Sequence, residues 1–76
     1  MTKYIIKKTT KYPCHKEGVY YMTRHFARPN EIGECERKDA FLDRNEAHAY
    51  MLEIINYDLP YRARGFEFDY EIVEVN

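Results

Sequence analysis

The sequence predicts a small α+β domain in which one helix packs on one face of a three-stranded antiparallel sheet, in the order β-β-α-β. Three observations support this prediction. Residues 66–75 (FEFDYEIVEV) alternate apolar and mostly acidic side chains, which is the period of two of a strand. Apolar residues recur at helical spacing after Asp43, and a short connection joins two earlier strands. The 76 residues are expected to form a single domain, residues 1–76.

The first part of the chain predicts a β-hairpin. Residues 3–10 (KYIIKKTT) are rich in β-branched side chains, and residues 19–27 (VYYMTRHFA) are expected to form the second strand. The connecting residues, 11–18, contain Pro13, which cannot donate a hydrogen bond to a β-ladder. The polar stretch that follows, residues 28–39, is expected to be a loop.

One helix is expected from Arg44 to about Tyr57. Asp43 is placed to act as its N-cap, and Glu46, three residues later, would complete a capping box. Pro60 is expected to stop the helix, because the residue before a proline is pushed out of the α region. The helical face that would pack on the sheet carries Ala47, Tyr50, Met51 and Ile54, widened by Leu52 and Ile55.

Charge is segregated along a chain whose net charge is −1. Residues 1–38 hold nine Lys and Arg against four Asp and Glu, whereas residues 39–76 hold three against nine. If the last strand pairs antiparallel with a central first strand, opposite charges lie side by side: Lys3, Lys7 and Lys8 against Glu67, Asp69, Glu71 and Glu74. The alternative is a basic nucleic-acid face, although a pI near 6.3 lacks the basic excess usual for that class.

Candidate catalytic and metal-binding residues are few. The chain contains no Ser, which excludes a serine nucleophile. Its Cys and His residues lack the paired spacing of zinc sites, so we interpret them as scattered thiols and imidazoles: Cys14, His15, His25, Cys35 and His48. The carboxylates of the last strand follow the pattern of a solvated strand face. We therefore expect no enzymatic activity, no catalytic or metal-binding residue and no cofactor.

Tyrosines and arginines are the expected binding residues. Residues 61–65 (YRARG) place two arginines beside an aromatic ring in a predicted loop, and Arg and Tyr are enriched at binding hot spots. The alternative is a solvated loop whose arginines pair with acids such as Asp58. One helix covers only one sheet face, so the other face should expose some of Tyr4, Tyr20 or Tyr21, Val73 and Val75. The candidate partner-binding residues are Tyr20, Tyr21, Tyr61, Arg62 and Arg64.

The expected function is a non-enzymatic protein-binding accessory module that binds an unidentified protein or forms a homodimer. No apolar run is long enough for a secretory signal or a membrane span, so we expect a cytoplasmic protein without membrane contacts. The alternative function is binding of single-stranded nucleic acid, in which Tyr20, Tyr21 and Phe26 would stack on bases while basic groups of the strands meet phosphates.

The layout also resembles that of small open reading frames found in bacteriophages and mobile elements. The resemblance is carried by residues 3–7 (KYIIK), by the Tyr-rich residues 18–21 (GVYY), by residues 40–47 (AFLDRNEA) and by the closing residues 70–75 (YEIVEV). It spans most of the chain and transfers no catalytic residue. It implies a non-enzymatic accessory protein of the kind that binds and inhibits a host protein.

Overall fold

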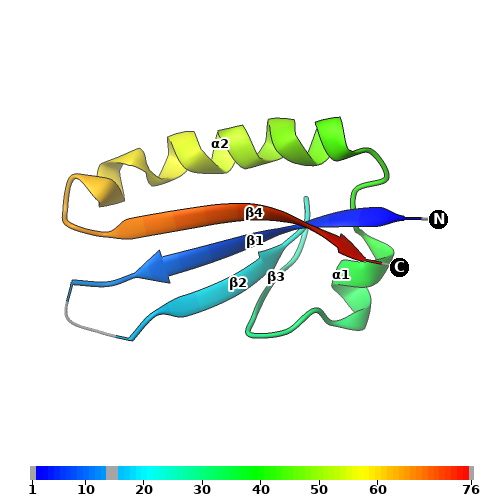
Figure 1. Cartoon of the computed structure of the whole chain (residues 1–76), viewed down its shortest axis with the longest axis horizontal. Helices are drawn as coiled ribbons and strands as arrows, with labels where there is room; N and C mark the ends of the chain where they lie inside the picture. Colours follow the sequence, from blue (N-terminus) through cyan, green and yellow to red (C-terminus); the bar gives the residue numbers. More distant parts are fainter. Residues whose placement is uncertain (1, 14–15, 76) are drawn as a thin grey trace.

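A computed structural model describes residues 2–13 and 16–75. The elements are β1 (Lys3–Lys11), β2 (Gly18–Met22), β3 (Ala27–Pro29), α1 (Glu34–Lys38), α2 (Arg44–Arg62) and β4 (Glu67–Val75). One antiparallel sheet holds the strands in the order β3-β2-β1-β4, and α2 runs along its length (Figure 1). The predicted α+β class is confirmed, but the sheet has four strands rather than three. No helix within the described ranges has the length and apolar character needed to cross a membrane.

The additional strand is β3, and it forms because the second strand ends earlier than residue 27, where it was expected to end. β2 ends at Met22 rather than Ala27, because the chain turns at Thr23. The Thr23 hydroxyl accepts hydrogen bonds from the N–H groups of His25 (3.3 Å) and Phe26 (3.0 Å), which is the turn chemistry that threonine supports. The chain then returns as β3, with Ala27 opposite Met22.

A short helix, α1, occupies the second half of the predicted loop. The buried carboxylate of Glu36 binds the guanidinium of Arg28 on β3 and accepts a hydrogen bond from the Gly33 N–H at 3.1 Å. Burial alone would raise the pKa of Glu36, but the bonds from Arg28 and Gly33 outweigh it and hold that pKa below its ordinary value. The expectation of a polar loop over the whole of residues 28–39 is therefore wrong, because the ion pair between Arg28 and the buried Glu36 carboxylate organises this segment.

Both faces of the sheet take part in the core, because alternate residues of β1 point to opposite faces. Ile6 faces α2 in a buried cluster with Phe41, Ala47 and Ile54. Ile5 faces the other way, in a cluster with Ala40 and Val75 against which Tyr21 and Ile32 pack. The expectation of an uncovered second face is wrong at this end of the sheet: Tyr21 and Val75 belong to the second cluster, and Tyr4 packs against the first.

The predicted central position of the first strand is confirmed. β1 pairs antiparallel with β4, so that Lys7 stands opposite Glu71 and Lys11 opposite Glu67. Opposed charges of this kind contribute about 0.2–1 kcal/mol each, and the register accounts for the segregation of charge along the chain. Lys8 lies on the α2 face instead, opposite Tyr70.

The start and the core-facing side of α2 agree with the sequence. Asp43 accepts a hydrogen bond from the Asn45 N–H at 2.9 Å, so it is the N-cap. Glu46 does not complete the capping box, because its carboxylate binds Arg24. Leu52 is 51% exposed and does not widen the core face, whose buried or packed members are Ala47, Tyr50, Met51 and Ile54.

The end of α2 differs from the prediction, since the helix passes Pro60 and ends at Arg62. A proline removes one N–H and strains the turn before it. Two features hold the chain beyond it. The Phe66 N–H donates to the Tyr61 carbonyl at 3.2 Å, and Gly65, with φ +98°, takes the left-handed conformation that commonly follows a helix. The residues expected in a loop at 61–65 are therefore the last turn of α2 and the turn that follows it.

Replacing Asp43 tests the start of α2. We expect Asp43→Ala to lower the free energy of unfolding by about 0.5–2 kcal/mol, because the first helical N–H groups lose their acceptor. In a domain of this size that loss lowers the melting temperature by roughly 4–8 °C per kcal/mol, measurable by circular dichroism. Asp43→Asn is the matched control and should retain most of the stability, since the amide oxygen still accepts. Equal melting of Asp43→Ala and the parent would show that the cap contributes nothing.

Candidate functional site

A concave surface opens between the C-terminal half of α2 and the sheet. It has a volume of about 330 Å³ and is open to solvent on one side. Six aromatic rings, four of them tyrosines, surround two charged side chains and one threonine there. We call this surface the tyrosine groove; its lining residues are Lys8, Thr10, Tyr12, Tyr20, Tyr57, Asp58, Tyr61, Phe66 and Phe68.

The helix side of the groove is formed by Tyr57 and Tyr61, which lie four residues apart and therefore on one face of α2. Their exposed fractions are 75% and 41%. The sheet side carries Tyr12, after β1, and Tyr20 on β2, and these two phenols are joined by a hydrogen bond that raises the pKa of Tyr12. Tyrosine thus supplies both sides of the groove.

Four of the six rings of the groove hold one another in place. Phe66 meets Tyr12 edge-on, with ring centroids 5.4 Å apart, and meets Tyr61 in the same way at 6.1 Å. The rings of Phe66 and Phe68 stack at 6.4 Å, and the series continues to Tyr70 at 6.3 Å. Aromatic pairs in such geometries each add about 0.5–1.5 kcal/mol beyond area burial, so the groove is formed before any ligand arrives.

The floor of the groove holds a buried ion pair. The Lys8 ammonium lies 2.7 Å from Asp58 Oδ2, and the side chains are 16% and 3% exposed. Tyr70 donates its phenolic hydrogen to the same carboxylate oxygen at 2.6 Å. Burial, and the bond to Asp58, raise the pKa of Tyr70 well above its ordinary value. Lys8 also lies 4.8 Å from the centroid of the Phe68 ring, within the range of a cation–π contact.

The tyrosine groove continues along the flank of α2. A second hollow, also of about 330 Å³, shares Lys8, Tyr57 and Asp58 with it and adds Met22, Tyr50, Glu53 and Ile54. A third hollow shares Tyr50 and Glu53 with the second and is further lined by Arg24, Glu46 and Ala49. At 1.5 Å per helical residue, the stretch of α2 from Glu46 to Tyr61 is about 23 Å long.

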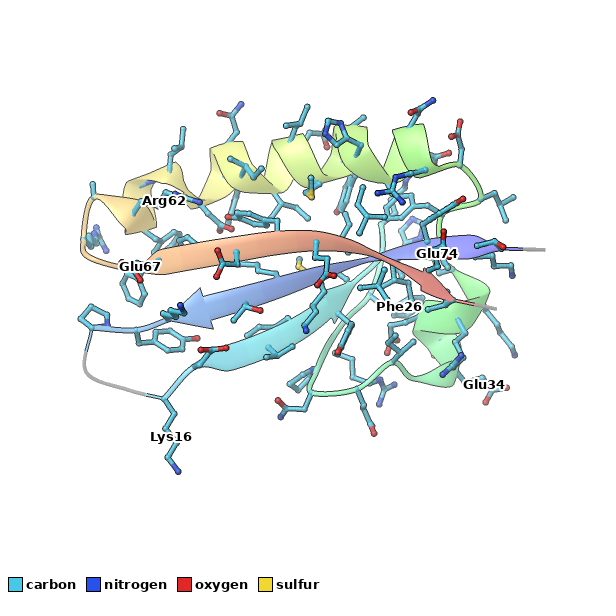
Figure 2. The ribbon with its side chains drawn as sticks, viewed as in Figure 1. Lys16, Phe26, Glu34, Arg62, Glu67 and Glu74 are labelled. Atoms are coloured by element: carbon cyan, nitrogen blue, oxygen red, sulfur yellow. The ribbon has the colours of Figure 1, made fainter. Side chains whose placement is uncertain are left out.

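The structure brings only two of the predicted binding residues together, Tyr20 and Tyr61. Tyr21 packs on the opposite face of the sheet. Figure 2 shows Arg62 at the end of α2, near Glu67 at the start of β4; its guanidinium donates to the Phe68 carbonyl at 3.3 Å. Arg64 is exposed in the turn after α2. The suggested pairing of these arginines with Asp58 is wrong, because Asp58 pairs with Lys8.

The sequence reasoning missed most of the groove. The sequence predicts a helix that ends at about Tyr57, and it assigns no binding role to Phe66 or Phe68. One signal was available, since Tyr57 and Tyr61 share a helical face once the helix is allowed to pass Pro60. No local pattern reveals that Lys8 would meet Asp58, because the two residues are fifty positions apart in the chain.

The thiol and imidazole groups that the structure describes do not gather into a site. His25 Nδ1 lies 3.0 Å from Asp39, and Cys35 and His48 are exposed. Among residues 2–13 and 16–75, no group of three or more potential metal ligands occurs. Cys14 and His15, which belonged to the same set, lie outside the described residues.

Comparison with known proteins yields no relative. No protein-family model, curated protein or solved structure matches the chain. The resemblance to open reading frames of bacteriophages and mobile elements therefore stays a prediction.

Removing Asp58 tests the floor of the groove. We expect Asp58→Ala to lower the free energy of unfolding by about 3–5 kcal/mol, because it leaves the Lys8 ammonium largely buried without its partner. The double variant Lys8→Met/Asp58→Leu is the matched control, since it removes both charges and keeps apolar bulk; it should recover most of the loss in urea unfolding. A double variant no more stable than Asp58→Ala would show that the loss has another cause.

The raised pKa of Tyr70 predicts a specific loss of stability at high pH. An unfolded tyrosine ionises near pH 10, whereas the folded Tyr70 holds its proton to higher pH. Its contribution to stability is therefore complete below about pH 10 and is lost as the pH rises through the folded pKa. We expect the melting temperature to fall less steeply above about pH 10 in Tyr70→Phe than in the parent. Parallel curves for the two proteins would contradict this assignment.

Proposed function

We propose that this protein is a non-enzymatic protein-binding module and that the tyrosine groove receives a segment of its partner. The observation that supports the proposal most is the lining of the groove. Six aromatic rings face an open hollow whose two charged groups, Lys8 and Asp58, already neutralise each other. Tyr is among the residues enriched at binding hot spots, because it offers a large rigid ring with a polar tip.

The same lining favours binding over catalysis. Acid–base and nucleophilic chemistry need a side chain that can give up or accept a proton within reach of a substrate. In the tyrosine groove the Asp58 oxygen that binds Lys8 also accepts the Tyr70 hydroxyl, so these groups satisfy one another. What remains facing solvent is chiefly tyrosine, with Tyr57 and Tyr61 the most exposed rings.

The shape favours a protein segment over a small molecule. Small-molecule sites bury most of their ligand, whereas the tyrosine groove is open and continues into two further hollows along α2. A surface of this length suits an elongated ligand that contacts several points in succession. We infer that the partner is a cytoplasmic protein, in line with the sequence-based expectation.

Single-stranded nucleic acid is the alternative ligand, since aromatic rings stack on bases. Such binding also needs cations near the phosphates. Here Lys8 is paired with Asp58, while Lys7 and Lys11 stand opposite Glu71 and Glu67. Besides Lys8, Arg62 lies next to the rings, with its guanidinium carbon 5.8 Å from the centroid of the Phe68 ring. One such cation is few for a chain that carries a phosphate on every nucleotide, so the charges favour a protein partner.

Peptide display tests the proposal directly. A random peptide library is selected on the parent protein and counter-selected on Tyr57→Ala/Tyr61→Ala, which removes two exposed rings and leaves the described core clusters unchanged. We expect enriched peptides that bind the parent at least about tenfold more tightly than the double variant. A selection that enriches no peptide, or only peptides that bind both proteins equally, would contradict the proposal.

A further inference from the structure

We propose that the segment received by the tyrosine groove is proline-rich and binds in the polyproline II conformation. This inference rests on the proposed function and specifies the chemistry of the partner. Pro-rich segments in this conformation are known to dock in aromatic-lined grooves. Three properties of the tyrosine groove point to such a ligand: its charge, its hydrogen-bonding groups and its rigidity.

The charge of the groove favours a neutral ligand. Lys8 and Asp58 are the two charged residues of the lining, and they lie 2.7 Å apart with Asp58 almost fully buried. The nearby Arg62, whose guanidinium carbon lies 5.8 Å from the Phe68 ring centroid, already donates to the Phe68 carbonyl. A ligand ammonium or carboxylate would have to compete with this pair while losing its own hydration, which is costly. An uncharged segment meets no such cost.

The hydrogen-bonding groups at the rim complement a backbone rich in carbonyls. Within the described residues, the hydroxyls of Tyr57 and Tyr61 make no hydrogen bond. A phenol donates well to a carbonyl oxygen. A proline-rich chain in the polyproline II conformation has solvent-exposed carbonyls and few N–H groups. The exposed phenols therefore meet a ligand that consists largely of acceptors.

Both the groove and a proline-rich ligand are rigid before they meet, which keeps the entropic cost of binding low. Phe66 is in edge-on contact with Tyr12 and Tyr61, and Phe68 stacks on Phe66, so these four rings are ordered in the free protein. A proline-rich segment is likewise restricted before it binds, because each ring fixes φ. Flat pyrrolidine rings can then lie against tyrosine faces without the loss of many side-chain rotamers.

A labelled oligoproline provides the test. We would titrate the parent protein into a fluorescein-labelled oligoproline of about ten residues, which spans roughly 31 Å in this conformation, and follow fluorescence anisotropy. A Gly-Ser peptide of the same length and label is the control ligand. Leu52→Ala is the control variant, since Leu52 is exposed on α2 and does not line the groove.

We expect saturable binding of the oligoproline and none of the Gly-Ser peptide. Tyr57→Ala should weaken binding by about tenfold or more, while Leu52→Ala should leave it unchanged. Tyr57→Phe isolates the hydroxyl and should weaken binding by roughly two- to tenfold. Tyr57 is 75% exposed, so neither substitution removes a core contact.

Two results would overturn the inference: equal binding of both peptides, or oligoproline binding that Tyr57→Ala does not affect. The oligoproline titration can fail without contradicting the proposed function. If display enriches groove-dependent peptides that lack proline while oligoproline does not bind, the protein-binding proposal stands and the proline-rich ligand is rejected. If neither experiment yields groove-dependent binding, both are rejected.

Discussion

The buried ion pair between Lys8 and Asp58 is the contact on which the rest of the groove depends. It joins the central strand β1 to α2, and the hydroxyl of Tyr70 adds β4 to the same carboxylate. Two charges removed from water must satisfy each other, which restricts α2 to one position over the sheet. Asp58 stands just before Pro60, so it anchors the helix where its hydrogen bonding is weakest and sets the direction of the turn that carries Tyr61.

Local signals were sufficient for most of the fold. The alternation of residues 66–75 predicted β4, and the Asp43 cap predicted the start of α2. The order of the elements predicted the pairing of β1 with β4, which in turn explains the segregation of charge. The failures share a cause, which is that specific side-chain contacts decide them and the types of residue in the segment do not. β3 and α1 depend on the ion pair between Arg28 and Glu36 and on the backbone hydrogen bonds that the Thr23 hydroxyl accepts. The residue types of this segment, taken alone, predict a polar loop.

The candidate site was less predictable than the fold. Tyr61 was identified because Tyr and Arg are common binding residues, whereas Tyr20 and Tyr21 were candidates for an uncovered sheet face. Tyr20 instead lines the groove on the α2 side, and Tyr21 packs against the second core cluster. Adjacent strand residues point to opposite faces, so Tyr20 and Tyr21 cannot share a surface. The groove itself required the end of α2 to be known, and that end depends on the contact between Lys8 and Asp58, on the Phe66–Tyr61 hydrogen bond and on Gly65 rather than on helix propensity.

Site-resolved amide hydrogen exchange tests this account most directly, because it reports where α2 ends in solution. If the ion pair anchors the helix beyond Pro60, the amides that close its end, at Ala63 and Phe66, which donate to Leu59 and Tyr61, should be protected in the parent protein. In Asp58→Asn they should exchange faster, while amides near Ala47 stay protected. Protection that ends before Pro60 in the parent, or that is the same in Asp58→Asn, would contradict the central role of the pair.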